Sequence, residues 1–180
     1  MTQPVLQAVT PSQTIGPFSH EAWQWACAAC ALASADGADT ITISGVLRDG
    51  DGAPVNDGMI EAWTPGAATI EHERAHVLAG FRRVPTDDEG RFTLVLSRAE
   101  EASCEPAALV TVFMRGLLVH QFSAVFLEDD DLDRAELLRQ VPAARRATLV
   151  ARKTGPASYA WDIRMQGELE TVFFDYGGKP

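Results

Sequence analysis

The sequence predicts a mainly β fold: a β-sandwich with short helices and an extended N-terminal arm. Three observations lead to this fold class. Apolar and polar residues alternate with a period of two in several short segments. Turn-forming clusters rich in Asp and Gly separate these segments at regular intervals. Hydrophobic residues make up 46% of 180 residues, enough for a sizeable core without a disulfide or metal to stabilise it.

The elements follow in order along the chain. The first 18 residues are rich in Pro and Gly and are expected to form an irregular arm, and the Ala-rich stretch from Glu21 to Ala33 is expected to be helical. Turns are expected at 49–52 and 87–90, and a short helix around Leu137. The predicted strands are 40–44, 59–63, 92–96, 109–114, 117–126, 148–152 and 159–166. Of these, 109–114 and 117–126 are apolar on both faces and are expected to be buried between layers. We therefore expect one domain, residues 1–180, with the arm and helix in 1–39 and the sandwich in 40–180.

The composition argues against several classes of function. Lys and Arg number 15 and Asp and Glu 25, which gives a net charge of −10. A chain this acidic repels phosphate backbones and anionic lipids, so no nucleic-acid or membrane partner is expected. The apolar runs are shorter than the ~20 residues that a membrane span needs, and the first residues show no secretory signal. A soluble, cytoplasmic protein is expected.

One motif matches a catalytic metal site. His72, Glu73 and His76 fit the His-Glu-x-x-His pattern, in which two His bind zinc and Glu acts as general base. The segment is highly charged, and only His120 lies downstream as a third ligand, within an apolar run. A solvated loop or helical turn is the favoured interpretation, and a zinc hydrolase is the alternative.

Two further motifs have weaker support. Cys27 and Cys30 have Cys-x-x-Cys spacing, but no βαβ pattern follows and no second pair of ligands is suitably spaced. Two small side chains on an Ala-rich helix are the favoured interpretation. Asp49 and Asp51 resemble the start of a calcium loop, which fails because Ala53 and Pro54 stand where a ligand and a glycine belong.

Four blocks of the sequence together carry a family resemblance. Residues 10–18 read Thr-Pro-Ser-Gln-Thr-Ile-Gly-Pro-Phe. Residues 43–63 give a strand, a turn and a strand that ends in Glu-Ala-Trp, and 86–92 give an acidic turn before another strand. Residues 162–176 form a tail that begins Asp-Ile-Arg-Met-Gln-Gly-Glu. In this order the blocks resemble the α chains of the protocatechuate 3,4-dioxygenases, which are intradiol ring-cleaving enzymes built from α and β chains.

The resemblance implies a division of labour between two chains. In the family, two Tyr and two His of the β chain hold Fe(III), and the enzyme cleaves 3,4-dihydroxybenzoate with O2 to 3-carboxy-cis,cis-muconate. The His pair belongs to a Pro-Ala-His-x-His pattern, which is similar to residues 106–110 here, with Ala108 and Val110 at the two His positions. Tyr159 and Tyr176, the only tyrosines, follow this segment, whereas the family's ligand tyrosines precede it. This chain is therefore expected to bind no iron and to be inactive alone.

The same resemblance points to a pocket shared with the β subunit. It implies that Thr14, Gly16 and Pro17 line the substrate entrance of the partner's site. Arg115 matches the family's Arg-Gly after an apolar strand, and its permanent charge suits an anionic substrate or intermediate. The alternatives are that the arm is only structural and that Arg115 pairs with an acidic residue on the surface.

Two other functions stay open from sequence alone. One is a self-sufficient enzyme, either the zinc hydrolase above or a divergent intradiol dioxygenase. The other is a stand-alone β-sandwich binding module that retains the fold without the enzyme partnership.

Overall fold

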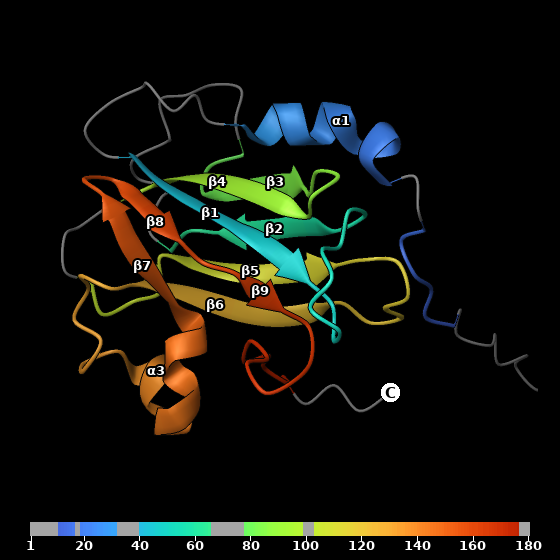
Figure 1. Ribbon diagram of the computed structural model, residues 1–180. Coiled ribbons are helices and arrows are strands. Elements are labelled where there is room, and N and C mark those ends of the chain that lie inside the picture. Colours follow the sequence, from blue (N-terminus) through green and yellow to red (C-terminus); the bar gives the residue numbers. More distant parts are fainter. Residues whose placement is uncertain (1–10, 17–18, 32–39, 66–77, 99–102, 177–180) are drawn as a thin grey trace, which may run out of the picture.

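A computed structural model describes residues 11–16, 19–31, 40–65, 78–98 and 103–176 of the chain. Most of the described residues lie in strands or in the turns between them, and the helices are few (Figure 1). The helices are α1 (Ser19–Cys30), α3 (Glu136–Arg139) and the 3-10 helix η1 (Ala143–Leu149). The strands are β1 (Thr40–Arg48), β2 (Met59–Trp63), β3 (Phe81–Pro85), β4 (Arg91–Ser97), β5 (Ala108–Phe113), β6 (Gln121–Leu127), β7 (Val150–Gly155), β8 (Ser158–Ala160) and β9 (Ile163–Arg164).

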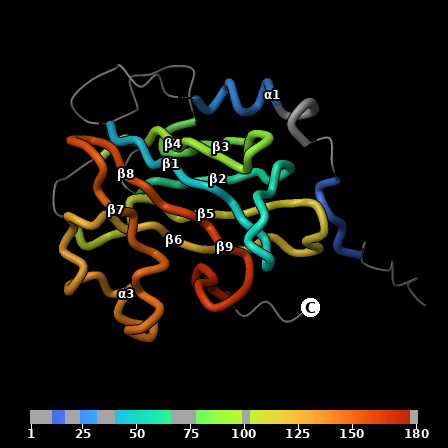
Figure 2. The backbone as a smooth tube through the Cα atoms, viewed as in Figure 1, coloured from blue at the N-terminus to red at the C-terminus, as the bar shows by residue number. Residues whose placement is uncertain are grey.

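The strands form one continuous path in the order β3-β2-β5-β6-β7-β8-β1-β4, with β9 paired to β1. The pairings from β3 to β6 and between β1 and β4 are antiparallel, whereas β6–β7, β1–β8 and β1–β9 are parallel. The short β6–β7 pairing joins the two halves of the path, which can be followed along the chain in Figure 2. The sheet is therefore mixed.

Both halves of the path contribute to a single core. The main cluster of buried side chains includes Ile43 of β1 and Leu94 of β4 from one half, and Ile60 of β2 and Val112 of β5 from the other. All four side chains are inaccessible to solvent. Because the two halves share this core, the predicted β-sandwich class is confirmed, with two layers that are continuous at one edge.

A glycine allows the close approach of two segments next to β1. A Cβ added to Gly45 would lie 1.7 Å from the backbone oxygen of Trp161. The Trp161 amide also donates to the Ser44 carbonyl at 2.9 Å. The chain crosses here between β8 and β9, so the continuous strand predicted over 159–166 is interrupted.

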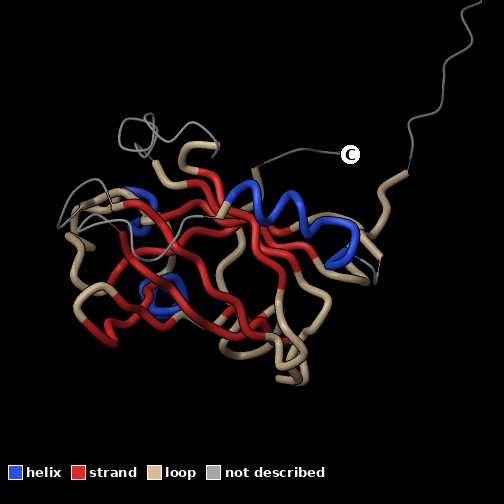
Figure 3. Tube along the Cα trace, turned by 90° about the horizontal axis from the view of Figure 1, so that it is seen from above, coloured by secondary structure: helices blue, strands red, loops and turns tan. Residues whose placement is uncertain are grey.

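Other boundaries also differ from the sequence-based expectations. Leu117 to His120, predicted as the start of a strand, form a loop, and β6 begins at Gln121. Strand β5 is not buried on both sides as predicted, since Leu109 is 41% exposed. Strand β3 and helix η1 were not predicted. Helix α1 ends at Cys30, earlier than expected, and packs against β3. Figure 3 shows this helix lying across the strands. None of the described helices is long and apolar enough to cross a membrane.

Candidate functional site

The turn that follows β5 presents Arg115 to solvent. Gly116 has a φ of +93°, a conformation that glycine adopts without steric cost. The Leu117 amide donates to the Met114 carbonyl at 3.3 Å and closes the turn. The Arg115 side chain is 63% exposed as a result.

The N-terminal arm is attached to this same turn. The Thr14 hydroxyl accepts a hydrogen bond from the Gly116 amide at 3.0 Å and donates one to the Met114 carbonyl at 3.3 Å. Gly16, with a φ of +75°, redirects the chain just after this contact. Thr14 and the turn that bears Arg115, about 100 residues apart in sequence, are thus brought together. Figure 1 shows the described part of the arm, residues 11–16, near the loop between β5 and β6. Pro17 lies outside the described residues.

A buried carboxylate orients Arg115. Its Nε lies 3.0 Å from Oδ2 of Asp57, a residue that is only 7% exposed. The two terminal nitrogens of the guanidinium have no partner among the described residues. The predicted pairing with an acidic residue is therefore present, yet it engages one nitrogen and leaves the planar end of the group available to a ligand.

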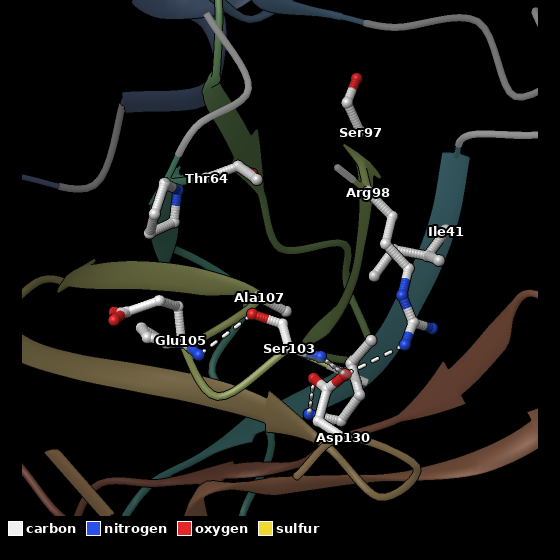
Figure 4. Close-up of a pocket in the computed structure, with 11 residues that line it drawn as sticks. Ile41, Thr64, Ser97, Arg98, Ser103, Glu105, Ala107 and Asp130 are labelled. Atoms are coloured by element: carbon white, nitrogen blue, oxygen red, sulfur yellow. Dashed lines mark hydrogen bonds and ion pairs between the residues drawn. The ribbon is translucent and has the colours of Figure 1, made fainter. Parts of the chain in front are cut away.

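A cavity lies at the opposite end of β5, where the strand begins. It has a volume of about 230 Å³. Apolar side chains that line it come from Ile41, Pro106, Ala107 and Leu127. Arg98 and Asp130 add charged groups to its wall, and Figure 4 shows the two side chains reaching toward each other.

These charged groups belong to a closed hydrogen-bonded network. Arg98 donates from Nη2 to Asp130 Oδ1 at 3.0 Å and from Nη1 to the Tyr159 hydroxyl at 2.9 Å. Tyr159 in turn donates to Asp129 Oδ1 at 2.9 Å, and Lys153 Nζ lies 2.7 Å from Asp129 Oδ2. Because each charge has an opposite partner, the network stabilises the fold and offers little free charge to a ligand.

The pKa values of the neighbouring residues Asp129 and Asp130 are shifted in opposite directions. Burial raises the pKa of Asp130, against the attraction of Arg98. Burial also acts to raise the pKa of Asp129, but hydrogen bonds from Lys153 and Tyr159 outweigh it and hold that pKa below its ordinary value. Burial, together with its hydrogen bond to Asp129, raises the pKa of the Tyr159 phenol. At neutral pH Tyr159 is therefore a neutral donor within the network and not a phenolate ligand.

The residues at the expected metal-ligand positions cannot bind iron. Ala108 and Val110 lie in the hydrophobic core, 0% and 1% exposed, and neither side chain has a donor atom. Ala107, the residue before β5, lines the cavity, and its methyl group is equally unable to bind a metal. Among the described residues, no group of three or more His, Cys, Asp or Glu is placed to hold a metal ion. The two positions at which the resemblance places histidine ligands therefore offer no ligand atom to a ferric ion.

Of the two Cys and His motifs noted in the sequence, the structure describes only the cysteine pair. The zinc-type motif of His72, Glu73 and His76 lies outside the described residues. Cys27 and Cys30 are free thiols at the end of α1, and burial raises the pKa of both. A raised pKa keeps a thiol protonated, which agrees with a packing role.

Comparison with solved structures shows the fold class. The chain is similar to the dioxygenase domain of a dioxygenase carbohydrate-binding fusion from Streptomyces sp. SirexAA-E, with a TM-score of 0.53, 15% identity and 96% of both chains covered. It is also similar to 3-chlorocatechol 1,2-dioxygenase from Rhodococcus opacus 1CP, with a TM-score of 0.51, 15% identity and coverage of 75% of this chain and 63% of that one. The fold is that of the intradiol dioxygenases.

Comparison of sequences gives the family within this class. The chain is 36% identical over 191 residues to the protocatechuate 3,4-dioxygenase alpha chain of Burkholderia cepacia, covering 92% of this chain and 96% of the relative. It is 31% identical over 202 residues to the alpha chain of Pseudomonas putida, covering 93% and 96%. No protein-family model matches it. The chain belongs to the family of protocatechuate 3,4-dioxygenase alpha chains.

Proposed function

We propose that this chain is the α subunit of a hetero-oligomeric protocatechuate 3,4-dioxygenase and completes the active-site pocket of a ferric β subunit. In the proposed reaction both atoms of O2 enter 3,4-dihydroxybenzoate as the bond between its hydroxyl-bearing carbons breaks, giving 3-carboxy-cis,cis-muconate. The kinship with two alpha chains supports the assignment. The partner's Fe(III) supplies the oxidative chemistry, and the residues of this chain bind and orient the substrate.

The observation that carries the proposal is the joint placement of Thr14 and Arg115. The hydroxyl of Thr14 fixes the arm to the turn that bears Arg115, and the ion pair with Asp57 holds the Nε side of the guanidinium. The exposed end of an arginine suits the carboxylate of a benzoate substrate, which accepts two parallel N–H hydrogen bonds. In this arrangement Arg115 binds the substrate anion, while Thr14 and Gly16 border the entrance; the same role proposed for Pro17 rests on the family resemblance alone.

We propose that the surface beside this site contacts the β subunit. Leu118 and Val119, which follow the Arg115 turn, are 64% and 58% exposed, although both are apolar. The ring of Tyr176, near the C-terminus, is 64% exposed and lies 5.2 Å from that of Phe122. Exposed apolar and aromatic side chains next to a charged site are typical of an interface that a partner covers.

Coexpression with a protocatechuate 3,4-dioxygenase β chain tests the proposal. The two chains are expected to copurify, and the complex is expected to consume O2 with 3,4-dihydroxybenzoate faster than the β chain alone. The complex should also be coloured, because tyrosinate bound to Fe(III) absorbs visible light. Separate elution of the chains, or turnover by this chain alone, would contradict the proposal.

A further inference from the structure

A shallow depression lies on the outer face of β7, β8 and β9, against helix η1. Its volume is about 570 Å³, within the usual range for small-molecule sites. Its apolar lining includes Ala147 of η1, Val150 of β7, Ala160 of β8 and the adjoining Trp161. The charged groups that line it are Arg152, Asp162 and Arg164.

The alternation of the strands produces this lining. Ala151, Tyr159 and Ile163 face the core and are buried, so Val150, Arg152, Ala160 and Arg164 face outward. Arg152 pairs directly with Ala160 across the sheet. The small side chain of Ala160 leaves space beside the long arginine, and this difference in size creates the depression.

The lining of the depression is positively charged, whereas the chain as a whole is negatively charged. No hydrogen bond or ion pair within the described residues involves the guanidinium of Arg152 or Arg164. Asp162 uses one oxygen, Oδ1, to accept a hydrogen bond from the Val46 amide at 2.9 Å. The lining thus has one net positive charge, two arginines against one aspartate, in a chain whose net charge is −10. Acidic groups are abundant in the chain, yet none neutralises these two arginines within the described part.

We propose that this depression binds a small monoanionic carboxylate with a flat apolar body, such as an aromatic acid. The carboxylate accepts hydrogen bonds from Arg152 or Arg164, and the ring lies over Ala160 and Val150. A single negative charge matches the net charge of the lining. The apolar floor adds contact area that inorganic phosphate or acetate cannot use. The inference does not depend on the β subunit, because every residue belongs to this chain.

Titration calorimetry of the full chain with benzoate tests the proposal. Benzoate is expected to bind in the millimolar range, and Arg152→Ala or Arg164→Ala to weaken it about tenfold by loss of charge-assisted hydrogen bonds. Arg139→Ala is the matched control, because the Arg139 side chain is exposed, makes no described contact and lies outside the depression, and its backbone hydrogen bonds remain in the variant. Far-ultraviolet circular dichroism of each variant checks that the fold is intact.

A second variant tests the depression without changing its charge. Ala160→Leu fills the floor and is expected to abolish benzoate binding while both arginines remain. Acetate and phosphate are expected to bind at least fivefold more weakly than benzoate, roughly 1 kcal/mol. Absence of benzoate binding, equal binding by all variants, or equal affinity for the three anions would each overturn the proposal.

Discussion

Two Arg–Asp pairs lie near opposite ends of strand β5, and they differ in almost every physical respect. Arg98 and Asp130, beside the cavity where the strand begins, are 18% and 2% exposed. Arg115 and Asp57, at the turn where it ends, are 63% and 11% exposed. Arg98 also binds Tyr159, whereas the terminal nitrogens of Arg115 have no described partner.

This difference between the two Arg–Asp pairs indicates that the two ends of β5 have different roles. Where the resemblance places the family's metal, this chain has Ala108 and Val110 in its core and a closed charge network next to them. Within that network each charged group has an opposite charge of the same chain as its partner. At the other end of β5 one cation remains available, beside an arm that is fixed in place. We expect the first region to determine stability and the second to act on a ligand in the assembled enzyme.

The largest expected effect is the loss of the buried pair. Arg98→Ala should lower the free energy of unfolding by about 3 kcal/mol, because Asp130 keeps its buried charge without a cation. Urea unfolding of the isolated chain measures this change in the free energy of unfolding. Arg91→Ala is the control, since the Arg91–Glu89 pair is 65% and 63% exposed and should contribute less than about 1 kcal/mol. Equal losses in the two variants would remove the contrast between buried and exposed pairs.

Removal of Arg115 from its pair with Asp57 should affect the reaction more than the fold. In a complex with a β chain, Arg115→Ala should lower kcat/KM about tenfold through loss of the hydrogen bonds to the substrate anion. The free energy of unfolding should fall by less than in Arg98→Ala, because Arg115 is 63% exposed and Asp57, at 11%, is less deeply buried than Asp130. Arg115→Lys, which retains the charge but not the planar fork, should give an intermediate rate. Unchanged kinetics in Arg115→Ala would assign this arginine to the surface alone.

The attachment of the arm should make a smaller contribution. Thr14→Val removes both hydrogen bonds of the hydroxyl and should cost about 1 kcal/mol. The Gly116 amide then loses its acceptor, so its hydrogen exchange, measured by NMR, should become faster. Thr14→Ser keeps the hydroxyl and should preserve the protection. Equal exchange rates in the valine and serine variants would show that this contact does not hold the arm.

The smallest effect concerns pH and the charge network. The pKa of Asp129 is below its ordinary value in the folded chain, so ionised Asp129 stabilises the fold fully above the unfolded pKa. That contribution is lost as the pH falls through the folded pKa. The difference in unfolding free energy between wild type and Asp129→Asn should therefore be largest near pH 7 and shrink below about pH 4. A difference that grows in acid would contradict this sign.

The sequence predicted the fold class and several strands, and its failures have physical causes. Strand β2 has the predicted bounds, because its apolar residues lie between clear turns. Leu118 is 64% exposed in a loop, although its apolar neighbours predicted a buried strand. Hydrophobicity alone does not distinguish a core strand from an exposed apolar loop. Strand β3 was missed because its two arginines look solvated, whereas Arg82 is buried and donates to the Phe81 and Val95 carbonyls.

The candidate site was predicted only in part. The family resemblance pointed to Thr14 and Arg115, and the structure brings Thr14 onto the turn that carries Arg115. Asp57 was not predicted, because it meets Arg115 only in the folded chain and belongs to no motif. The Arg98 network was missed for the same reason, since Arg98 and Tyr159 are 61 positions apart. Long-range polar contacts of this kind leave no periodic signal in a sequence.

The metal content of the chain, purified alone and then with a β chain, tests the central claim most directly. Elemental analysis of the isolated chain should find neither iron nor zinc above trace amounts, and the copurified complex should contain about one iron per αβ pair. Stoichiometric iron in the isolated chain, or zinc held by His72 and His76, would contradict the claim that this subunit completes a site whose metal belongs to its partner.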